Sequence, residues 1–410
     1  MSINILNFDV VIVGAGIAGA ALACALGNSD LKVAVVEAQS LSTQWPEQKY
    51  TLAGFDPRVS ALSPSSQRFL SHLGVWSRIS ERRLSAYHAM HVWDAEGTGS
   101  IDFAAQEINQ LELGHIVENR MTVAALLSRI RELANIQLID LACVSSINTL
   151  ESYQDSQCHQ LQLADGRQLH SPLIIAADGA NSQIRSQANF STREWDYRHH
   201  ALVVTVQTSK PHQNIAWQRF MPEGPLAFLP LQTDSADKHF CSIVWSTVPQ
   251  DAENLMALNE REFAQALAKA FEFRLGNILD IGRRLSFPLR QRHAHDYIKP
   301  GIALVGDAAH TVHPLAGQGI NLGLKDVQVL AQEILRAQQR GLDTASSQIL
   351  LRYQRRRKGD NLTMMIAMES FKRVFEQPAL PVRWLRNTGM RWLNSSRWLK
   401  HRVMREAMGL

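Results

Sequence analysis

Three short motifs, far apart in this chain of 410 residues, combine glycines with a carboxylate. The first is Gly14-x-Gly16-x-x-Gly19, which directly follows the β-branched run VVIV and is itself followed by Glu37 at the end of a second apolar run. This pattern predicts a strand, a glycine turn, a helix and a second strand that together bind a dinucleotide. Gly14 would make the turn, Gly16 would admit a pyrophosphate, and Gly19 would let the helix pack on the strand. Glu37 would accept hydrogen bonds from ribose hydroxyls.

The other two motifs each place a carboxylate at the end of an apolar run. Asp178-Gly179 follows LIIAA, and Gly306-Asp307 follows IALV. Alone, either motif could be an ordinary turn between two elements. Together with the first motif, they predict further polar contacts at the same edge of one sheet, where Asp307 would accept hydrogen bonds from hydroxyl groups.

The residues after Asp307 are mostly small, and glycines continue to Gly323, where a helical pattern has begun. Gly317 and Gly319 would let a flat ring approach the backbone, because a side chain at either position would block it. Backbone N–H groups at the start of the helix are unpaired and favour negative charge. In an irregular stretch upstream, Arg58 is either a ligand for a phosphate or ring edge, or a surface arginine.

Composition bounds the class of protein. Hydrophobic residues make up 45% of the chain and charged residues 20%, as in a soluble globular protein, and the length predicts two domains. The four cysteines are widely separated, so they predict neither a disulfide framework nor a metal site. The uncharged segment Val10–Gly27 could be considered as a membrane span. Its glycines and alanines, and the lack of a preceding Lys or Arg, argue against an anchor or a signal peptide.

The elements that would position the motifs are scattered along the chain. We predict an α/β fold: a Rossmann-like nucleotide-binding domain, an inserted antiparallel β-sheet domain for substrate, and C-terminal helices. The strands of the inserted sheet are expected between Trp195 and Val248. The predicted boundaries are 1–83, 115–185 and 295–345 for the nucleotide domain, 84–114 and 186–294 for the substrate domain, and 346–410 for a basic helical region.

The three motifs in this order resemble the FAD-dependent aromatic hydroxylases with the para-hydroxybenzoate hydroxylase fold. Within that class, the run GDAAHTVHPLAGQGINLGLKD (Gly306–Asp326) resembles the UbiH/UbiF/UbiI group of ubiquinone-biosynthesis hydroxylases. Further runs, such as YHAMHVWD (Tyr87–Asp94) and REAMGL (Arg405–Leu410), are most similar to the 2-polyprenylphenol hydroxylases of that group. The resemblance spans nearly the whole chain.

The resemblance implies FAD as cofactor, O2 as co-substrate, and NAD(P)H or another electron donor without a separate Rossmann domain of its own. The glycines of the first motif would hold the pyrophosphate and Glu37 the adenosine ribose, while Asp307 would bind the ribityl hydroxyls. Asp178-Gly179 would contact both FAD and transiently bound NAD(P)H, and the turn Pro314–Gly319 would flank the isoalloxazine. The full set of implied cofactor residues is Gly14, Gly16, Gly19, Glu37, Arg58, Arg120, Asp178, Gly179, Gly306, Asp307, Pro314, Gly317, Gly319 and Asn321.

The implied reaction is hydroxylation of a polyprenylated phenol through a flavin C4a-hydroperoxide. Phe228 and Trp245 could line the substrate site, or they could be core residues. His310 and His313 could assist deprotonation of the phenol beside Pro314, or they could stabilise the loop. Two alternatives stay open: a flavin hydroxylase of another ring position or of a small aromatic acid, and a flavin-binding protein that does not hydroxylate.

Basic charge is concentrated at the C-terminal end, where nine Lys and Arg residues accompany two Glu residues from Phe371 to Leu410. The rest of the chain is slightly acidic, so nucleic acid is not an expected partner. Tryptophans are interleaved with these basic residues. The pattern fits helices that touch an anionic membrane or a lipid-carrying partner, or helices with a buried aromatic face and solvated charges. The expected location is cytoplasmic, with membrane association left open, as are a homo-oligomer and a ubiquinone-biosynthesis complex.

Overall fold

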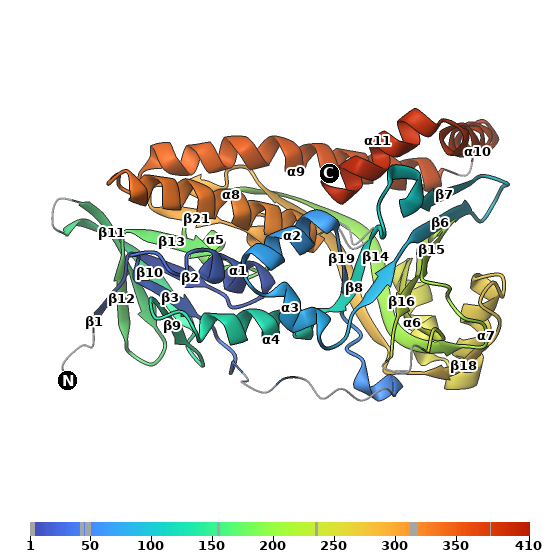
Figure 1. Cartoon of the computed structure of the whole chain (residues 1–410), viewed down its shortest axis with the longest axis horizontal. Coiled ribbons are helices and arrows are strands. Elements are labelled where there is room, and N and C mark those ends of the chain that lie inside the picture. Colours follow the sequence, from blue (N-terminus) through green and yellow to red (C-terminus); the bar gives the residue numbers. More distant parts are fainter. Residues whose placement is uncertain are drawn as a thin grey trace.

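The computed structural model of this chain describes residues 5–41, 45, 51–153, 156–233, 237–311, 319–377 and 379–410. Within these residues, four sheets and a series of helices form two regions that lie side by side along the long axis of the molecule (Figure 1). The fold class predicted from the sequence is confirmed. The predicted domain boundaries stay a proposal.

A six-stranded sheet organises the first region. Its order is β20 (Ile298–Lys299), β21 (Ile302–Leu304), β13 (Leu173–Ala176), β2 (Val10–Val13), β3 (Val33–Val36) and β9 (Ile136–Ile139). Strands β21, β13, β2, β3 and β9 run parallel. Strands β2, β3, β13 and β21 are apolar runs buried at every residue, as parallel strands with both faces covered require. The register aligns Val13, Ala176 and Leu304, so the loops that follow these three strands leave the sheet at one edge.

Helices cover this sheet. Helix α1 (Ile17–Ala25) packs against α4 (Asn119–Ile130) and α8 (Gly319–Gln339), and α8 packs against the long helix α9 (Ser347–Glu376). Figure 1 shows α8 and α9 running along one side of the sheet. Helix α1 is composed almost entirely of small and apolar residues, which suits a helix buried between a sheet and two other helices.

A nine-stranded sheet organises the second region. It contains β22 (His310–Thr311), β19 (Leu285–Ala294), β14 (Thr192–Thr208), β17 (Phe240–Thr247), β16 (Gly224–Leu231), β15 (Ile215–Met221), β6 (Ala89–Asp94) and β7 (Ser100–Ala104), in that order, with β18 (Ile278–Ile281) paired to β14. Most neighbours are antiparallel, but β15 and β6 are parallel. One face packs on α7 (Glu260–Ala270) and α6 (Pro249–Ala257).

Smaller elements join the two regions. A three-stranded sheet of β4 (Val59–Leu62), β8 (Gly114–Glu118) and β5 (Ser85–Tyr87) lies against β16 of the large sheet. A four-stranded sheet of β1 (Ile5–Asn7), β12 (Gln168–Ser171), β11 (Ser156–Leu163) and β10 (Val144–Tyr153) flanks the parallel sheet. Short helices α2 (Pro64–His72), α3 (Trp76–Ser80) and α5 (Gln183–Gln187) complete this region.

The chain ends in α10 (Leu380–Ser395) and α11 (Arg397–Met408), which lie over the β6–β7 end of the large sheet (Figure 1). Helix α10 contacts β7, and α11 contacts the short 3-10 helix η2 (Ala105–Ile108). In the part of the chain described here, no helix combines the length and hydrophobicity needed to cross a membrane.

Candidate functional site

A pocket of about 900 Å³ lies at the edge where β2, β13 and β21 end. All three glycine–carboxylate motifs contribute to its wall, although nearly 300 residues separate the first from the last. The pocket residues that the sequence pointed to are Gly14, Gly16, Glu37, Arg58, Arg120, Asp178, Gly179, Gly306, Asp307 and Gly319. The structure therefore brings together ten of the predicted cofactor residues.

The three glycines of the first motif are required for different reasons. Gly14 has a φ of +102°, and a methyl group there would lie 2.4 Å from the carbonyl oxygen of Ala177. A methyl group on Gly19 would lie 1.9 Å from the carbonyl oxygen of Gly14. Gly16, in contrast, has an extended backbone and free space around it, since no atom lies within 4 Å of an added methyl group. The fold itself requires Gly14 and Gly19, whereas Gly16 leaves room at the N-terminus of α1 for a group outside the chain.

Glu37 is held in a fixed orientation at the end of β3. Its two carboxylate oxygens accept hydrogen bonds from the backbone N–H groups of Ala15 (2.8 Å) and Gln39 (3.0 Å). Each oxygen retains a further lone pair, and the side chain is only partly buried in the pocket wall. The carboxylate can therefore accept hydrogen bonds from a ribose.

Asp178 is anchored on one side. Its Oδ2 accepts hydrogen bonds from the backbone N–H groups of Gln183 (2.8 Å) and Ile184 (3.2 Å), while its Oδ1 is buried and has no partner among the described residues. An unpaired buried carboxylate oxygen in a pocket wall is costly unless a ligand donates to it. Gly179 has a φ of +80°, which explains the glycine after the aspartate.

Asp307 opens into the pocket from the turn after β21, since its side chain is exposed there. Enclosure by surrounding protein nevertheless raises the pKa of Asp307, an effect that the nearby charges of His310 and Arg58 partly oppose. A carboxylate in such a pocket gains from hydroxyl donors that replace lost water.

Two arginines also line the pocket. Arg58 is exposed to the pocket, and Arg120 donates to Glu118 (2.9 Å) and to the carbonyl oxygen of Gly54 (2.5 Å). Glu118 also pairs with the buried Arg83. Arg120 is thus partly used within the chain, while the head of Arg58 faces the pocket.

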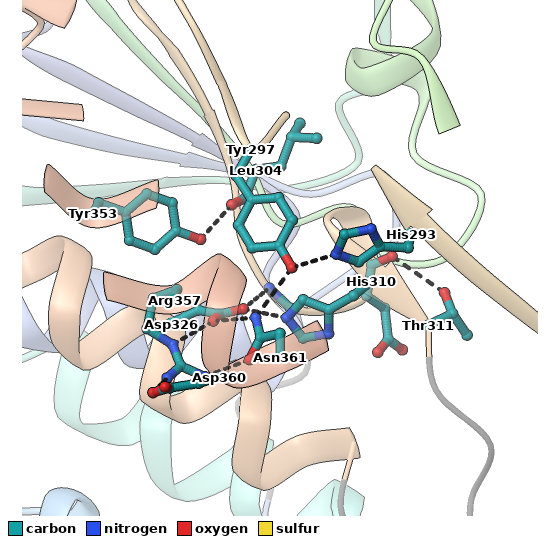
Figure 2. Close-up of polar contacts among 12 residues, drawn as sticks. His293, Tyr297, Leu304, His310, Thr311, Asp326, Tyr353, Arg357, Asp360 and Asn361 are labelled. Atoms are coloured by element: carbon teal, nitrogen blue, oxygen red, sulfur yellow. Dashed lines mark hydrogen bonds and ion pairs between the residues drawn. The ribbon is translucent and has the colours of Figure 1, made fainter. Parts of the chain in front are cut away.

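A buried polar network around Asp326 (Figure 2) binds the Gly306-Asp307 turn. Asp326 of α8 accepts hydrogen bonds from the backbone N–H of Gly306 (3.2 Å) and pairs with His310 (2.5 Å) and Arg357 (2.9 Å). Burial acts to raise the pKa of Asp326, but His310 and Arg357 outweigh it and hold that pKa below its usual range. Asn361 of α9 also donates to Asp326 (3.1 Å). The network ties α8 and α9 to the turn that carries Asp307.

Other predicted residues lie elsewhere. His310 is 1% exposed, belongs to the network just described and does not line the pocket. Asn321 is buried; it donates to the carbonyl oxygen of Ala61 (2.8 Å) and accepts from the backbone N–H of Ser63 (3.0 Å), so it fixes the start of α8. His313, Pro314 and Gly317 lie outside the described residues.

The two nominated substrate residues are in a hydrophobic core. Phe228 is fully buried and stacks on Phe271 with ring centroids 3.7 Å apart. Trp245 of the neighbouring strand is 8% exposed and belongs to the same cluster, between the large sheet and helices α6 and α7. This is the sheet face that the helices cover. The opposite face carries Leu229, which packs toward the three-stranded sheet of the cofactor region.

Two residues of the site were not assigned a role from the sequence. Arg185, 4% exposed, donates to the carbonyl oxygens of Ala308 (2.9 Å) and Ala180 (2.7 Å) and so joins the second motif to the third. Asp326 is fully buried. The available signal for Asp326 was an acidic residue among the apolar positions of an amphipathic helix, as Glu333 also is, and a buried charge needs a partner.

Comparison with known proteins agrees with this geometry. A family model described as "FAD binding domain" matches residues 7–364. The chain is 36% identical to 3-demethoxyubiquinol 3-hydroxylase of Escherichia coli, over 98% of both chains. It is 34% identical to the mitochondrial ubiquinone biosynthesis monooxygenase COQ6 of Xenopus tropicalis, over 97% of this chain and 92% of that one.

Among solved structures, p-nitrophenol 4-monooxygenase PnpA from Pseudomonas putida has the same fold, with a TM-score of 0.77 over 99% of both chains and 18% identity. The space at Gly16 and the unpaired oxygen of Asp178 fit a bound FAD. The predicted family and cofactor are confirmed. The chain belongs to the family of FAD-dependent monooxygenases that includes the ubiquinone-biosynthesis hydroxylases.

Proposed function

We propose that this enzyme hydroxylates the aromatic ring of a polyprenylated phenol, using O2 and electrons from NAD(P)H or another donor. The observation that carries the proposal is the open space at Gly16, in a pocket that also holds Glu37, Asp178 and Asp307. The family relationship supplies the substrate class: both relatives described above act, by their names, in ubiquinone biosynthesis or on a ubiquinol.

Bound FAD supplies the oxygen-transfer chemistry, and the chain supplies position and electrostatics. The N-terminus of α1 and the space at Gly16 would receive the pyrophosphate. Glu37 would accept hydrogen bonds from the adenosine ribose and Asp307 from the ribityl hydroxyls. Arg58 would contribute positive charge near the phosphates.

The substrate would lie against the face of the large sheet that looks toward the cofactor region. Side chains alternate between the two faces of a strand, so Leu229 projects opposite to Phe228. In the adjacent strand, Val244 projects opposite to Trp245. Leu229 and Val244 are partly buried rather than sealed in the core. We therefore propose Leu229 and Val244, in place of Phe228 and Trp245, as walls of the substrate site.

Product analysis tests the function. Purified holoenzyme is incubated with 2-polyprenylphenol, O2 and NADPH, and the lipid extract is analysed by mass spectrometry. We expect a product that has gained one oxygen atom. A small aromatic acid serves as the competing substrate, and its preferential hydroxylation would replace the polyprenylphenol proposal. Consumption of NADPH with hydrogen peroxide as the sole product from every phenol would support the flavin protein that does not hydroxylate.

Site of action and assembly are part of the proposal. The resemblance favours a cytoplasmic enzyme that meets its lipid substrate at a membrane or on a lipid-carrying partner. A homo-oligomer and association with other enzymes of ubiquinone biosynthesis are further proposals, which size-exclusion chromatography with light scattering would check.

A further inference from the structure

The outward face of α10 is apolar. Leu380 is 74% exposed, Trp384 67%, Leu385 65% and Trp392 61%. At about 100° of rotation per residue, Trp384, Leu385 and Trp392 fall within roughly 100° of one another around the helix. Trp398, 70% exposed, follows at the start of α11. These five residues are called the apolar face. Such a group of large exposed side chains is unusual for a solvated surface.

The inward face of the same helix is mixed: Met390 packs in a hydrophobic cluster with β6 and β7, and two polar side chains bind beside it. Arg386, 5% exposed, forms a two-pronged ion pair with the buried Asp94 of β6, with N–O distances of 2.8 and 2.9 Å. Asn387 donates to Asp94 (2.8 Å) and accepts from the backbone N–H of Gly99 (2.5 Å). Helix α10 therefore differs from an ordinary surface helix, because large apolar side chains lie on its solvent side as well as toward the core. Packing on the body of the protein does not account for its tryptophans.

Positive charge surrounds the apolar face. Arg391, Arg397, Arg402 and Arg405 are all exposed, and the guanidinium of Arg402 lies 5.8 Å from the ring centre of Trp398. Glu406 is the sole acidic residue between positions 379 and 410 of the sequence. A partner for this surface must therefore be apolar and carry negative charge.

We propose that the apolar face docks on the surface of a membrane that contains anionic phospholipids. Tryptophan is favoured at the boundary between headgroups and acyl chains, and nearby arginines gain from anionic headgroups. A second copy of the chain fits less well, because a two-fold interface would bring the same basic residues of both copies together. Access to a membrane-dissolved polyprenyl substrate is the benefit of docking, and this part rests on the proposed function.

Vesicle flotation of the full-length holoenzyme tests the surface. Vesicles of phosphatidylcholine alone are compared with vesicles that also contain phosphatidylglycerol. We expect binding that requires the anionic lipid, and a fall of about tenfold or more in the partition coefficient of the double variant Trp384→Ser/Trp392→Ser. Reversing Arg391 and Arg397 to Glu should weaken binding to the anionic vesicles at least as strongly. FAD absorbance reports that each variant is folded.

Matched controls are available on the same chain. Trp195 is 36% exposed on β14, and Arg340 is exposed directly after α8. Trp195→Ser and Arg340→Glu should bind vesicles as the unmodified enzyme does. Binding that is independent of anionic lipid, or equal in all variants, would overturn the proposal. So would a dimer, seen by sedimentation, that dissociates in the tryptophan variant without any vesicle binding by the unmodified enzyme.

The two proposals fail separately. If the unmodified enzyme does not bind anionic vesicles but hydroxylates a short-chain phenol in solution, the proposed function stands and the docking surface is overturned. Anionic-lipid-dependent binding through α10, with no hydroxylation of any phenol, would leave the docking surface standing and remove the proposed function.

Discussion

At the scale of single residues, Gly16 and Asp326 show two ways in which a site depends on one position. Gly16 is needed for binding of the ligand, because its backbone is extended and no atom of the chain lies within 4 Å of an added methyl group. Asp326 never reaches the pocket, yet it holds the turn that does. Substitution at the first should affect binding without affecting folding, and substitution at the second should affect folding.

Replacing Gly16 by Val should yield a folded protein with little FAD. An added Cβ at this position meets no atom of the chain within 4 Å, and the valine would occupy the approach of the pyrophosphate to the start of α1. The measurement is the ratio of flavin to protein absorbance after purification, together with the melting temperature of the flavin-free form. Gly14→Val is the matched control: at a φ of +102° with Ala177 in contact, it should lose stability as well as flavin. Full flavin content in Gly16→Val would count against the assigned pyrophosphate site.

Replacing Asp326 by Asn should destabilise the fold by about 3–5 kcal/mol, because Arg357 and His310 would lose the buried carboxylate between them. Urea unfolding of the flavin-free protein measures the change. Asp360→Asn is the control, since Asp360 pairs with the same Arg357 (2.8 Å) but is 71% exposed. It should cost no more than about 1 kcal/mol. Equal costs for the two variants would contradict the central role of Asp326.

At the scale of elements, sequence patterns predicted which segments form strands and helices better than which way they face. Alternation in β16 separates Phe228 from Leu229, but a single strand does not tell which face a helix covers. The orientation of helix α10 was likewise not determined by its sequence pattern. Its sequence allows a buried aromatic stripe, yet the surface beneath it offers Asp94 and the backbone of Gly99, so Arg386 and Asn387 turn inward beside Met390 while the tryptophans face solvent.

The cofactor pocket was more predictable, because glycine spacing and strand-end carboxylates are local signals and parallel strands bring their carboxyl ends to one edge. Gly16, Glu37, Asp178 and Asp307 meet for this reason. His310 was less predictable, since its partner Asp326 lies 16 residues further along the chain. Contacts that depend on tertiary packing leave no spacing rule in the sequence.

Replacing Arg386 by Leu should release α10 from the large sheet. Asp94 would keep a buried charge without its main partner, and the local cost should be about 3–5 kcal/mol. Hydrogen exchange followed by mass spectrometry should show faster exchange in residues 380–395 while the flavin stays bound. Arg391→Leu, at an exposed position of the same helix, should leave exchange unchanged. Unaltered protection in Arg386→Leu would show that apolar contacts such as Met390 suffice to hold α10.

At the scale of the whole molecule, the insertion of residues 177–301 between β13 and β21 decides the architecture. These two strands are neighbours in the parallel sheet, with Ala176 aligned to Leu304, although most of the large sheet is built between them in sequence. The inserted sheet returns to the cofactor region at β22, which pairs with β19. The cofactor region and the large sheet are therefore parts of one connected body, and loss of stability in either region should reach the other.

Acid should destabilise this body through buried histidines. His212 is fully buried, its Nε2 donates to the carbonyl oxygen of Leu231 (3.1 Å) and its Nδ1 accepts from the backbone N–H of Asn214 (3.0 Å). Burial lowers the pKa of His212 from 6.5 to about 4, and burial likewise lowers the pKa of His115 and His293 to about 4. Between about pH 4 and pH 6.5, these histidines bind protons in the unfolded chain but not in the folded chain. Stability should be fully present above about pH 6.5 and should fall as pH decreases toward 4.

Replacing His212 by Gln should flatten that dependence. Each such histidine adds a slope of up to about 1.4 kcal/mol per pH unit in this interval, and the variant lacks one of them. Urea unfolding near pH 7.5 and near pH 5 measures the difference in free energy of unfolding, which should be smaller for the variant than for the unmodified protein. Gln218→Ala, at a buried neutral position, separates loss of stability from loss of titration, because it should lower both values equally. An unchanged slope in His212→Gln would mean that His212 accepts its proton in the folded protein as readily as in the unfolded chain, and that its two hydrogen bonds do not keep it neutral.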